Sequence, residues 1–130
     1  MFQGFTPGGA SLRRVVLRLR AGGTFPASGT LSSVTVRADS PRAEPLASAE
    51  VIVSGPRATG EQINVTYGFP AGTRLTPGRL YVIGWSSPRD GDGVLTWMAA
   101  TGNPYPSGQA YNCIGTATPD EDFIFATYGE

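Results

Sequence analysis

The sequence predicts an all-β protein with a single domain, and three observations support this. Segments of alternating apolar and polar residues recur along the chain, a two-residue period typical of strands with one buried face. The 18 glycines and 11 prolines are spread out rather than clustered, which indicates many short elements joined by turns. No segment shows the 3.6-residue period of an amphipathic helix. We therefore expect residues 1–130 to form one antiparallel β-sandwich of about eight or nine strands.

Composition excludes several classes of function. A chain of 130 residues with 40% hydrophobic residues is large enough for one hydrophobic core. Its ten arginines are balanced by ten acidic residues, so no strongly basic surface is expected and nucleic-acid binding is disfavoured. The absence of histidine removes the commonest metal ligand and every Ser–His or Cys–His catalytic pair. The single cysteine, Cys113, cannot form an intramolecular disulfide and is expected to be a buried, inert thiol.

The sequence contains no targeting or membrane segment. No apolar run approaches the roughly 18 residues that a membrane-spanning helix needs. The residues after Met1 lack the basic region and the apolar run of a signal peptide. We therefore expect no membrane insertion, and a protein that is made as it stands and folds from end to end.

The first strands are short and amphipathic. Gln3–Thr6 is expected to be an edge strand that is ended by the turn residues 7–9. Leu12–Arg20 is the clearest early strand. In it Val15, Leu17 and Leu19 face the core, whereas Arg14, Arg18 and Arg20 face solvent, with Val16 as the exception. The three arginines suggest either a binding stripe or a solvated outer face, and we favour the solvated face.

Four further strands are expected in the middle of the chain, at Leu31–Asp39, Ala47–Val53, Gln62–Phe69 and Leu80–Ser86. Gln62–Phe69 alternates most regularly, with its odd-numbered residues apolar. Leu80–Ser86 is nearly all apolar, as a central strand covered on both faces would be. Before it, Thr76-Pro77-Gly78 has the composition of a tight turn, with proline for a fixed φ and glycine for a positive φ.

The last quarter of the chain is where we expect the fold to close. Val94–Ala99 reads as one strand, and Asp120–Tyr128 as another in which Phe123 and Phe125 point one way and Ile124 and Ala126 the other. A strand at the chain end needs a place in a sheet to be stable. Short strands at intervals of about 8–12 residues indicate a sandwich or a barrel. We favour a jelly roll because this arrangement limits exposed sheet edges.

Several short motifs are spread along the chain. They are the Gln-x-Phe start at Gln3-Gly4-Phe5, the amphipathic strand Leu12–Arg20, the L-x-x-G-x-x-Y segment Leu75–Tyr81, the Y-x-x-G-x-A-Y segment Tyr105–Tyr111 and the closing D-x-x-F-x-x-Y strand Asp122–Tyr128. Together they resemble the carbohydrate-binding-like jelly-roll domains of bacterial surface and phage virion proteins. The resemblance covers almost the whole chain and implies a module without catalytic activity. The chain departs from the secreted members in having no secretion signal and no partner domain.

Two acidic clusters are candidate sites for calcium binding. Asp90-Gly91-Asp92-Gly93 looks like half of a calcium loop, but no third ligand and no closing glutamate follow, so a hairpin turn is favoured. We expect no cofactor, although the resemblance allows a structural calcium ion near Asp120 and Asp122, for which we consider Asp39 as a further ligand. Carboxylates two residues apart fit neither geometry of a glycoside hydrolase, so we expect no enzyme.

Aromatic residues are the positive indication of binding. Trp97, Tyr105 and Tyr111 flank one loop, and exposed rings stack on sugars or anchor protein partners. Trp85 and Tyr111 are equally suited to the core, which is the interpretation we favour for them. Tyr105, between two prolines and close to Asn103, is the strongest candidate for contact with a partner.

The sequence therefore suggests two functions. The first is a structural or attachment module of a bacteriophage virion, as a capsid decoration or a tail-associated protein, whose partners are other subunits and further copies of itself. The second is a secreted carbohydrate-binding or adhesion module, excised from a larger bacterial protein, that acts outside the cell or on its surface and binds a glycan. A flat apolar interface would favour the first. A concave aromatic groove would favour the second.

Overall fold

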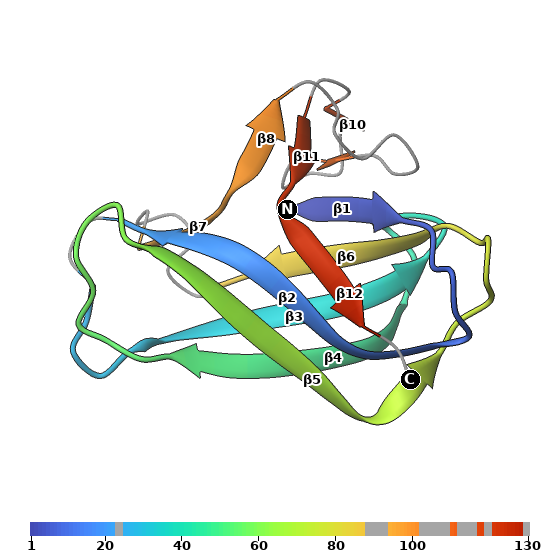
Figure 1. Cartoon of the computed structure of the whole chain (residues 1–130), viewed down its shortest axis with the longest axis horizontal. Helices are drawn as coiled ribbons and strands as arrows, with labels where there is room; N and C mark the ends of the chain where they lie inside the picture. The colour runs from blue at the N-terminus through green and yellow to red at the C-terminus, as the bar shows by residue number, and fades with distance from the viewer. Residues whose placement is uncertain (23–24, 88–93, 102–109, 112–116, 119–120, 129–130) are drawn as a thin grey trace.

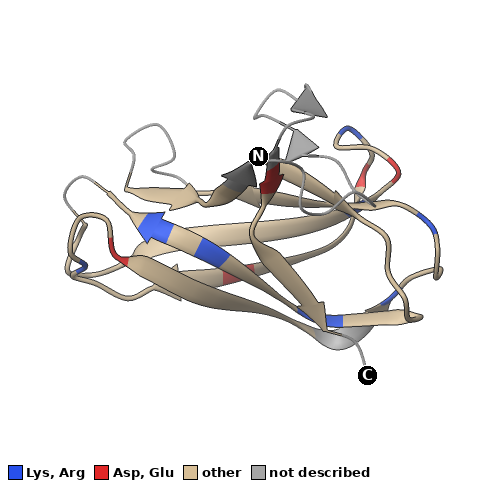
Figure 2. Cartoon of the chain, turned by 45° about the horizontal axis from the view of Figure 1, so that its top comes forward, with Lys and Arg blue, Asp and Glu red and all other residues tan. Residues whose placement is uncertain are grey.

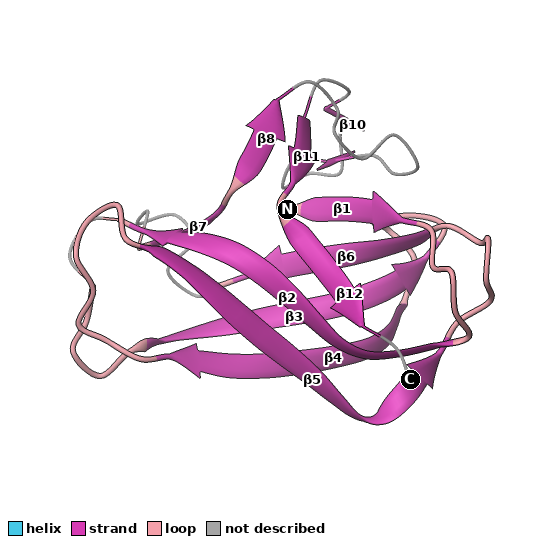
Figure 3. Cartoon of the chain, viewed as in Figure 1, coloured by secondary structure: helices cyan, strands magenta, loops and turns pink. Residues whose placement is uncertain are grey.

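The computed structural model describes residues 1–22, 25–87, 94–101, 110–111, 117–118 and 121–128. These ranges form an all-β, antiparallel sandwich, which confirms the predicted fold class (Figure 3). Within them there is no helix of the length and apolar character needed to cross a membrane. The jelly-roll order of the strands stays a prediction.

Two sheets make the layers of the sandwich. The six-stranded sheet has the order β10 (Ala117–Thr118), β9 (Ala110–Tyr111), β1 (Phe2–Phe5), β6 (Tyr81–Ser86), β3 (Thr30–Ala38) and β4 (Pro45–Val53). In the four-stranded sheet, β2 (Ser11–Ala21) pairs with β5 (Gln62–Arg74) on one side and with β12 (Phe125–Tyr128) and β7 (Leu95–Trp97) on the other. A ribbon of β8 (Ala99–Thr101) and β11 (Glu121–Phe123) extends beyond the two layers (Figure 1).

The alternation in the sequence places the core between the two sheets. Val15, Leu17 and Leu19 of β2 are fully buried, as predicted. The odd-numbered residues of β5 join them from the same sheet, and residues of β3 and β6 face them from the other: Val65, Tyr67, Phe69, Val34, Val36, Ile83 and Trp85. Burial of apolar surface at about 25 cal/mol per Å² makes this layer the main source of stability.

A buried hydrogen-bond network joins the two sheets at Ser32. The Trp85 Nε1–H of β6 donates a 2.8 Å hydrogen bond to the Ser32 Oγ of β3, and this hydroxyl also shares a hydrogen bond with the Tyr67 hydroxyl of β5. Burial raises the pKa of the Tyr67 phenol, and the hydrogen bonds with Ser32 and Trp85 partly offset this. The network satisfies three polar groups that would otherwise be costly to bury.

The predicted turn and central strand are confirmed. Arg79 N donates a 3.1 Å hydrogen bond to Thr76 O across the turn, and Gly78 has a φ of 82°. The β6 strand lies between β1 and β3, and five of its six residues are buried. Its apolar composition therefore reflects cover on both faces.

The predicted edge position of the first strand is wrong. β1 lies inside the six-stranded sheet, with β6 on one side and β9 on the other. β9 and β10 contain two residues each, too few to show any periodicity, so the sequence offered no sign of a neighbour on that side.

Two predicted strands are each divided in the structure, which is one reason why the described residues form twelve strands and not eight or nine. The segment 94–99 breaks at Met98 between β7 and β8, and the segment 120–128 breaks at Ile124 between β11 and β12. Met98 N donates to Arg18 O and Ile124 N donates to Met98 O, each at 2.9 Å. At this point the two segments leave β2 and pair with each other as the β8–β11 ribbon.

Candidate functional site

The outer surface of the four-stranded sheet carries a row of arginines. We use the term arginine face for the exposed residues Arg14, Arg18 and Arg20 of β2, Gln62, Asn64 and Thr66 of β5, and Tyr128 of β12. The strand period turns these side chains away from the core, because their neighbours in sequence are buried. Pairing of β2 with β5 sets Arg18 opposite Asn64 and Arg20 opposite Gln62.

Neighbouring side chains orient two of these arginines. The Arg18 Nε–H donates a 3.2 Å hydrogen bond to Asn64 Oδ1 across the β2–β5 pair. The Arg14 guanidinium carbon lies 4.7 Å from the centre of the Tyr128 ring, which is a cation–π arrangement. Each contact joins residues that the strand register places side by side, so the groups are held in a row along β2.

The charge of this face is not neutralised within the described part of the chain, where none of its three arginines forms an ion pair. Figure 2 shows the basic segments along β2, with the acidic residues at other places. Glu61, just before β5, pairs with Arg57 at 2.8 Å, and Glu50 projects from the outer side of β4 in the other sheet. The chain has no net charge, yet this surface is locally basic.

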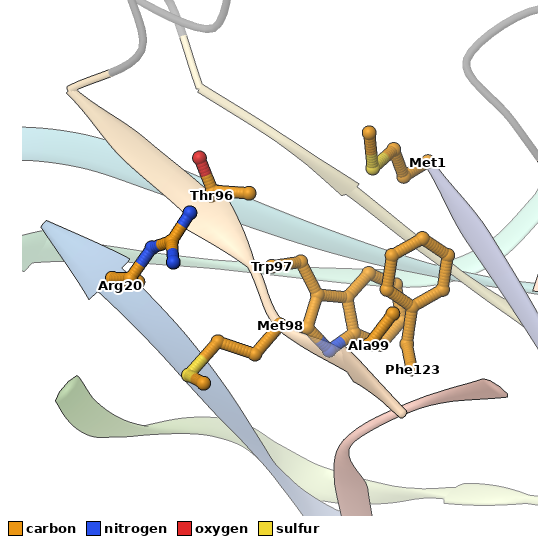
Figure 4. A pocket seen from close by; sticks show the side chains of 7 residues that line it. All are labelled: Met1, Arg20, Thr96, Trp97, Met98, Ala99 and Phe123. Atoms are coloured by element: carbon orange, nitrogen blue, oxygen red, sulfur yellow. The ribbon is translucent and has the colours of Figure 1, made fainter. Parts of the chain in front are cut away.

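Two hollows lie along this surface. The first, of about 220 Å³, lies between β2 and β12 and is lined by Val16, Arg18, Asn64, Ile124, Phe125, Ala126 and Tyr128. The second, of about 320 Å³, lies at the Arg20 end and is lined by Met1, Arg20, Thr96, Trp97, Met98, Ala99 and Phe123 (Figure 4). Both combine an apolar wall with an arginine.

The predicted aromatic contacts do not form a common surface among the described residues. Trp97 is only 1% exposed; its Nε1–H donates a 3.0 Å hydrogen bond to Ile124 O, and its ring stacks on Phe123 with centroids 4.4 Å apart. Trp97 is therefore a core residue. The backbone of Tyr111 pairs with Phe2 in the β9–β1 ladder. Tyr105 and Asn103 lie outside the described residues.

The carboxylates predicted to bind calcium are held by different partners. Asp122 is buried, and its Oδ1 accepts a 3.1 Å hydrogen bond from the Gln3 side chain. Asp39, with a φ of 68°, accepts hydrogen bonds of 3.1 and 2.7 Å from the Arg79 guanidinium. Over the described ranges no group of three or more His, Cys, Asp or Glu side chains could hold a metal ion. Asp120, Asp90, Asp92 and Cys113 lie outside these ranges.

Ion pairs lower the pKa of two surface carboxyls, and this can be measured. Hydrogen bonds from Arg79 lower the pKa of Asp39 below its ordinary value of 3.8, and those from Arg57 and then the Ala58 amide lower that of Glu61. A carboxyl with a lowered pKa stabilises the fold above its ordinary pKa, and this contribution is lost as the pH falls through the lower value. We expect an NMR titration of Arg79→Gln to return Asp39 towards its ordinary pKa and to leave Glu61 unchanged. Equal shifts of both carboxyls would contradict this assignment.

Sequence reasoning missed the role of Gln3. Its side chain is fully buried and joins β1 to β11: Nε2 donates to Asp122 Oδ1, and Oε1 accepts a 2.7 Å hydrogen bond from Phe123 N. These contacts span about 120 residues of sequence, so no local pattern could have shown them. The polar residues of β5 were predicted to face outward, but their alignment with the arginines depends on the register of the sheet.

The described geometry offers contact surfaces: a flat basic face, two shallow hollows beside it, and the outer side of β4. Searches with this sequence match no protein-family model and no curated protein. The function is therefore inferred from the fold and from these surfaces.

Proposed function

We propose that the chain is a non-catalytic structural and attachment module of a bacteriophage virion, as a capsid decoration or a tail-associated protein. One observation carries this proposal. Leu46 and Ile52, on the outer face of β4, are 53% and 67% exposed, whereas nearly all other large apolar side chains in the described ranges are at least partly buried. We interpret these two exposed apolar side chains on one strand as part of a surface that another protein covers.

The outer face of β4 is suited to contact with a second copy of the chain. Its exposed residues are Leu46, Ser48, Glu50 and Ile52, and Leu31 of β3 lies beside Ile52. If the β4 strands of two copies cross the interface antiparallel with Ala49 at the centre, Leu46 meets Ile52 and Ser48 meets Glu50. This arrangement joins apolar with apolar residues and keeps the two glutamates apart, so the surface is complementary to itself.

The position of the aromatic residues also supports an assembly role. Trp85, Trp97, Tyr67 and Tyr81 all lie in the core, and the exposed Tyr128 stacks with Arg14. A concave groove lined by aromatic rings, typical of many sugar-binding sites, is not found among the described side chains. This favours subunit contact over an aromatic sugar groove.

Light scattering tests the assembly. We expect protein purified from its source, or concentrated recombinant protein, to have a mass at least twice that of the 13.6 kDa chain. The double variant Leu46→Ser/Ile52→Ser should dissociate it, because the apolar contact is lost. The matched control, Gln62→Ser/Thr66→Ser on the outer face of the other sheet, should leave the mass unchanged. A wild-type monomer at all concentrations would rule out the assembly role.

The second candidate is an extracellular or cell-surface module that binds carbohydrate or mediates adhesion. The arginine face favours it, because guanidinium groups and amide side chains lie side by side on the outer surface of one sheet. A monomer that binds a glycan would support this candidate.

A further inference from the structure

The arginine face has a regular spacing of charged and neutral groups. Residues two apart on a strand are separated by about 6.8 Å, so Arg18 and Arg20 present guanidinium groups about one such step apart, and Arg14 lies about 14 Å from Arg18. The neighbouring row on β5 contributes amides and a hydroxyl opposite the same positions. Any ligand that follows β2 would therefore meet cationic groups on one side and neutral hydrogen-bonding groups on the other.

The chemistry of these groups selects a carboxylate-bearing ligand. A guanidinium group has five donors in a planar fork, and this fork matches the two oxygens of a carboxylate. Arg18 uses its Nε–H for Asn64, and its terminal nitrogens form no hydrogen bond or ion pair with a described residue. The amides of Gln62 and Asn64 have donors and acceptors for hydroxyl groups. We infer that the arginine face binds an acidic polysaccharide, a polymer of sugar residues that carry carboxylate groups.

The hollows beside the arginines fit this class of ligand. A sugar ring has an apolar side and polar edges. In the smaller hollow, Val16, Ile124 and Ala126 form an apolar wall beside the Arg18 fork. The larger hollow offers a polar end at Arg20 and Thr96, because the Trp97 and Phe123 rings at its other end are buried (Figure 4). A sugar ring in the smaller hollow would find an apolar wall and a guanidinium partner for its carboxylate, and the next sugar along β2 would meet the Arg20 guanidinium.

Single-stranded nucleic acid is the other anionic polymer to consider, and the face is less suited to it. Binding of that kind combines phosphate contacts with aromatic platforms on which bases stack. Tyr128 is the exposed ring of this face, and Arg14 already lies over it.

Calorimetric titration with polygalacturonate tests the inference. We expect the wild-type protein to bind this polymer, and to bind it more weakly as salt is raised, because exposed charges are screened. The carboxyl-reduced polymer should bind at least tenfold more weakly. Equal affinity for both polymers, or no binding of polygalacturonate, would overturn the inference.

Variants locate the site. Arg18→Gln/Arg20→Gln should reduce the affinity for polygalacturonate at least tenfold. Arg42→Gln/Arg79→Gln, which removes the same charge from exposed arginines outside the face, should change it less than twofold. If the first variant does not fold, Gln62→Ala/Asn64→Ala provides the same test from β5. Equal losses in the face variant and in the control would overturn the inference.

Two further polymers distinguish other ligands. Poly-glutamate carries carboxylates without sugar rings, and single-stranded DNA carries phosphates. If the wild type binds either polymer more tightly than polygalacturonate, and Arg18→Gln/Arg20→Gln weakens that binding, then that polymer and not the polysaccharide is the ligand class of the arginine face. We expect both to bind more weakly than polygalacturonate.

This inference rests on the attachment part of the proposed function, and the two can fail separately. Leu46→Ser/Ile52→Ser should dissociate the assembly and keep the affinity of each subunit for polygalacturonate. A monomeric wild type that binds the polymer would remove the assembly role and retain the arginine face. A wild type that assembles but does not bind the polymer would retain the assembly role and overturn the inference about the arginine face.

Discussion

Trp85→Ala is expected to lower the free energy of unfolding by about 3–5 kcal/mol, the usual cost of truncating a buried tryptophan. Trp85 is 3% exposed in the centre of the six-stranded sheet, so the substitution leaves a cavity between the layers. It also removes the Nε1–H that donates to Ser32. The cavity is the larger effect, because Ser32 keeps its hydrogen bond with Tyr67.

Urea unfolding followed by circular dichroism measures this loss, and two variants separate its causes. Trp85→Phe keeps an aromatic ring and removes the N–H, so it should cost clearly less than alanine. Tyr128→Ala removes a ring that is 44% exposed and should cost less than about 1 kcal/mol. A loss of less than 1 kcal/mol for Trp85→Ala would show that this residue does not join the layers as described.

Much of the sandwich could be predicted because its strands have one buried face. In β2 and β5 the apolar residues fall at every second position, and burial follows the same pattern. The Thr76–Arg79 turn was equally predictable, since proline fixes its own φ and glycine permits a positive φ. Where one residue and its near neighbours decide the conformation, sequence reasoning is sufficient.

The errors arise where a contact depends on distant residues. Apolar residues run through Met98 and Ile124 without a turn residue, although the chain changes its pairing partner at both positions. The internal position of β1 depends on β9, more than 100 residues away in sequence. No local pattern contains that information, since strand partners are set by the packing of the whole domain.

The candidate site was also predictable only in part. Exposure of Arg14, Arg18 and Arg20 follows from strand period alone. The contact of Arg18 with Asn64 spans 46 residues and depends on the register between β2 and β5. A shift of one residue would point the β5 amides into the core. The arginine row was therefore predictable, and its alignment with the polar residues of β5 was not.

Gln3→Leu is expected to destabilise the protein by about 2–4 kcal/mol, because buried polar groups lose a hydrogen-bond partner. Leucine has a similar volume, so packing should change little. The Phe123 N–H loses the acceptor to which it donates at 2.7 Å, and the Asp122 carboxylate loses a donor at 3.1 Å. Gln62→Leu is the matched control: the same substitution at an exposed position of β5 should change stability by less than about 0.5 kcal/mol.

Amide hydrogen exchange shows where the loss of Gln3 acts. In the structure, the Gln3 side chain joins the ribbon strand β11 to β1 of the six-stranded sheet. Without it, the ribbon should open locally before the sandwich unfolds, so protection of the Ile124 amide, which donates to Met98 O and not to Gln3, should fall more than that of β2 amides such as Leu17. An equal fall at both amides would mean that Gln3 stabilises the whole domain. Selective loss at Ile124 would show that one buried amide side chain holds the ribbon against the sandwich.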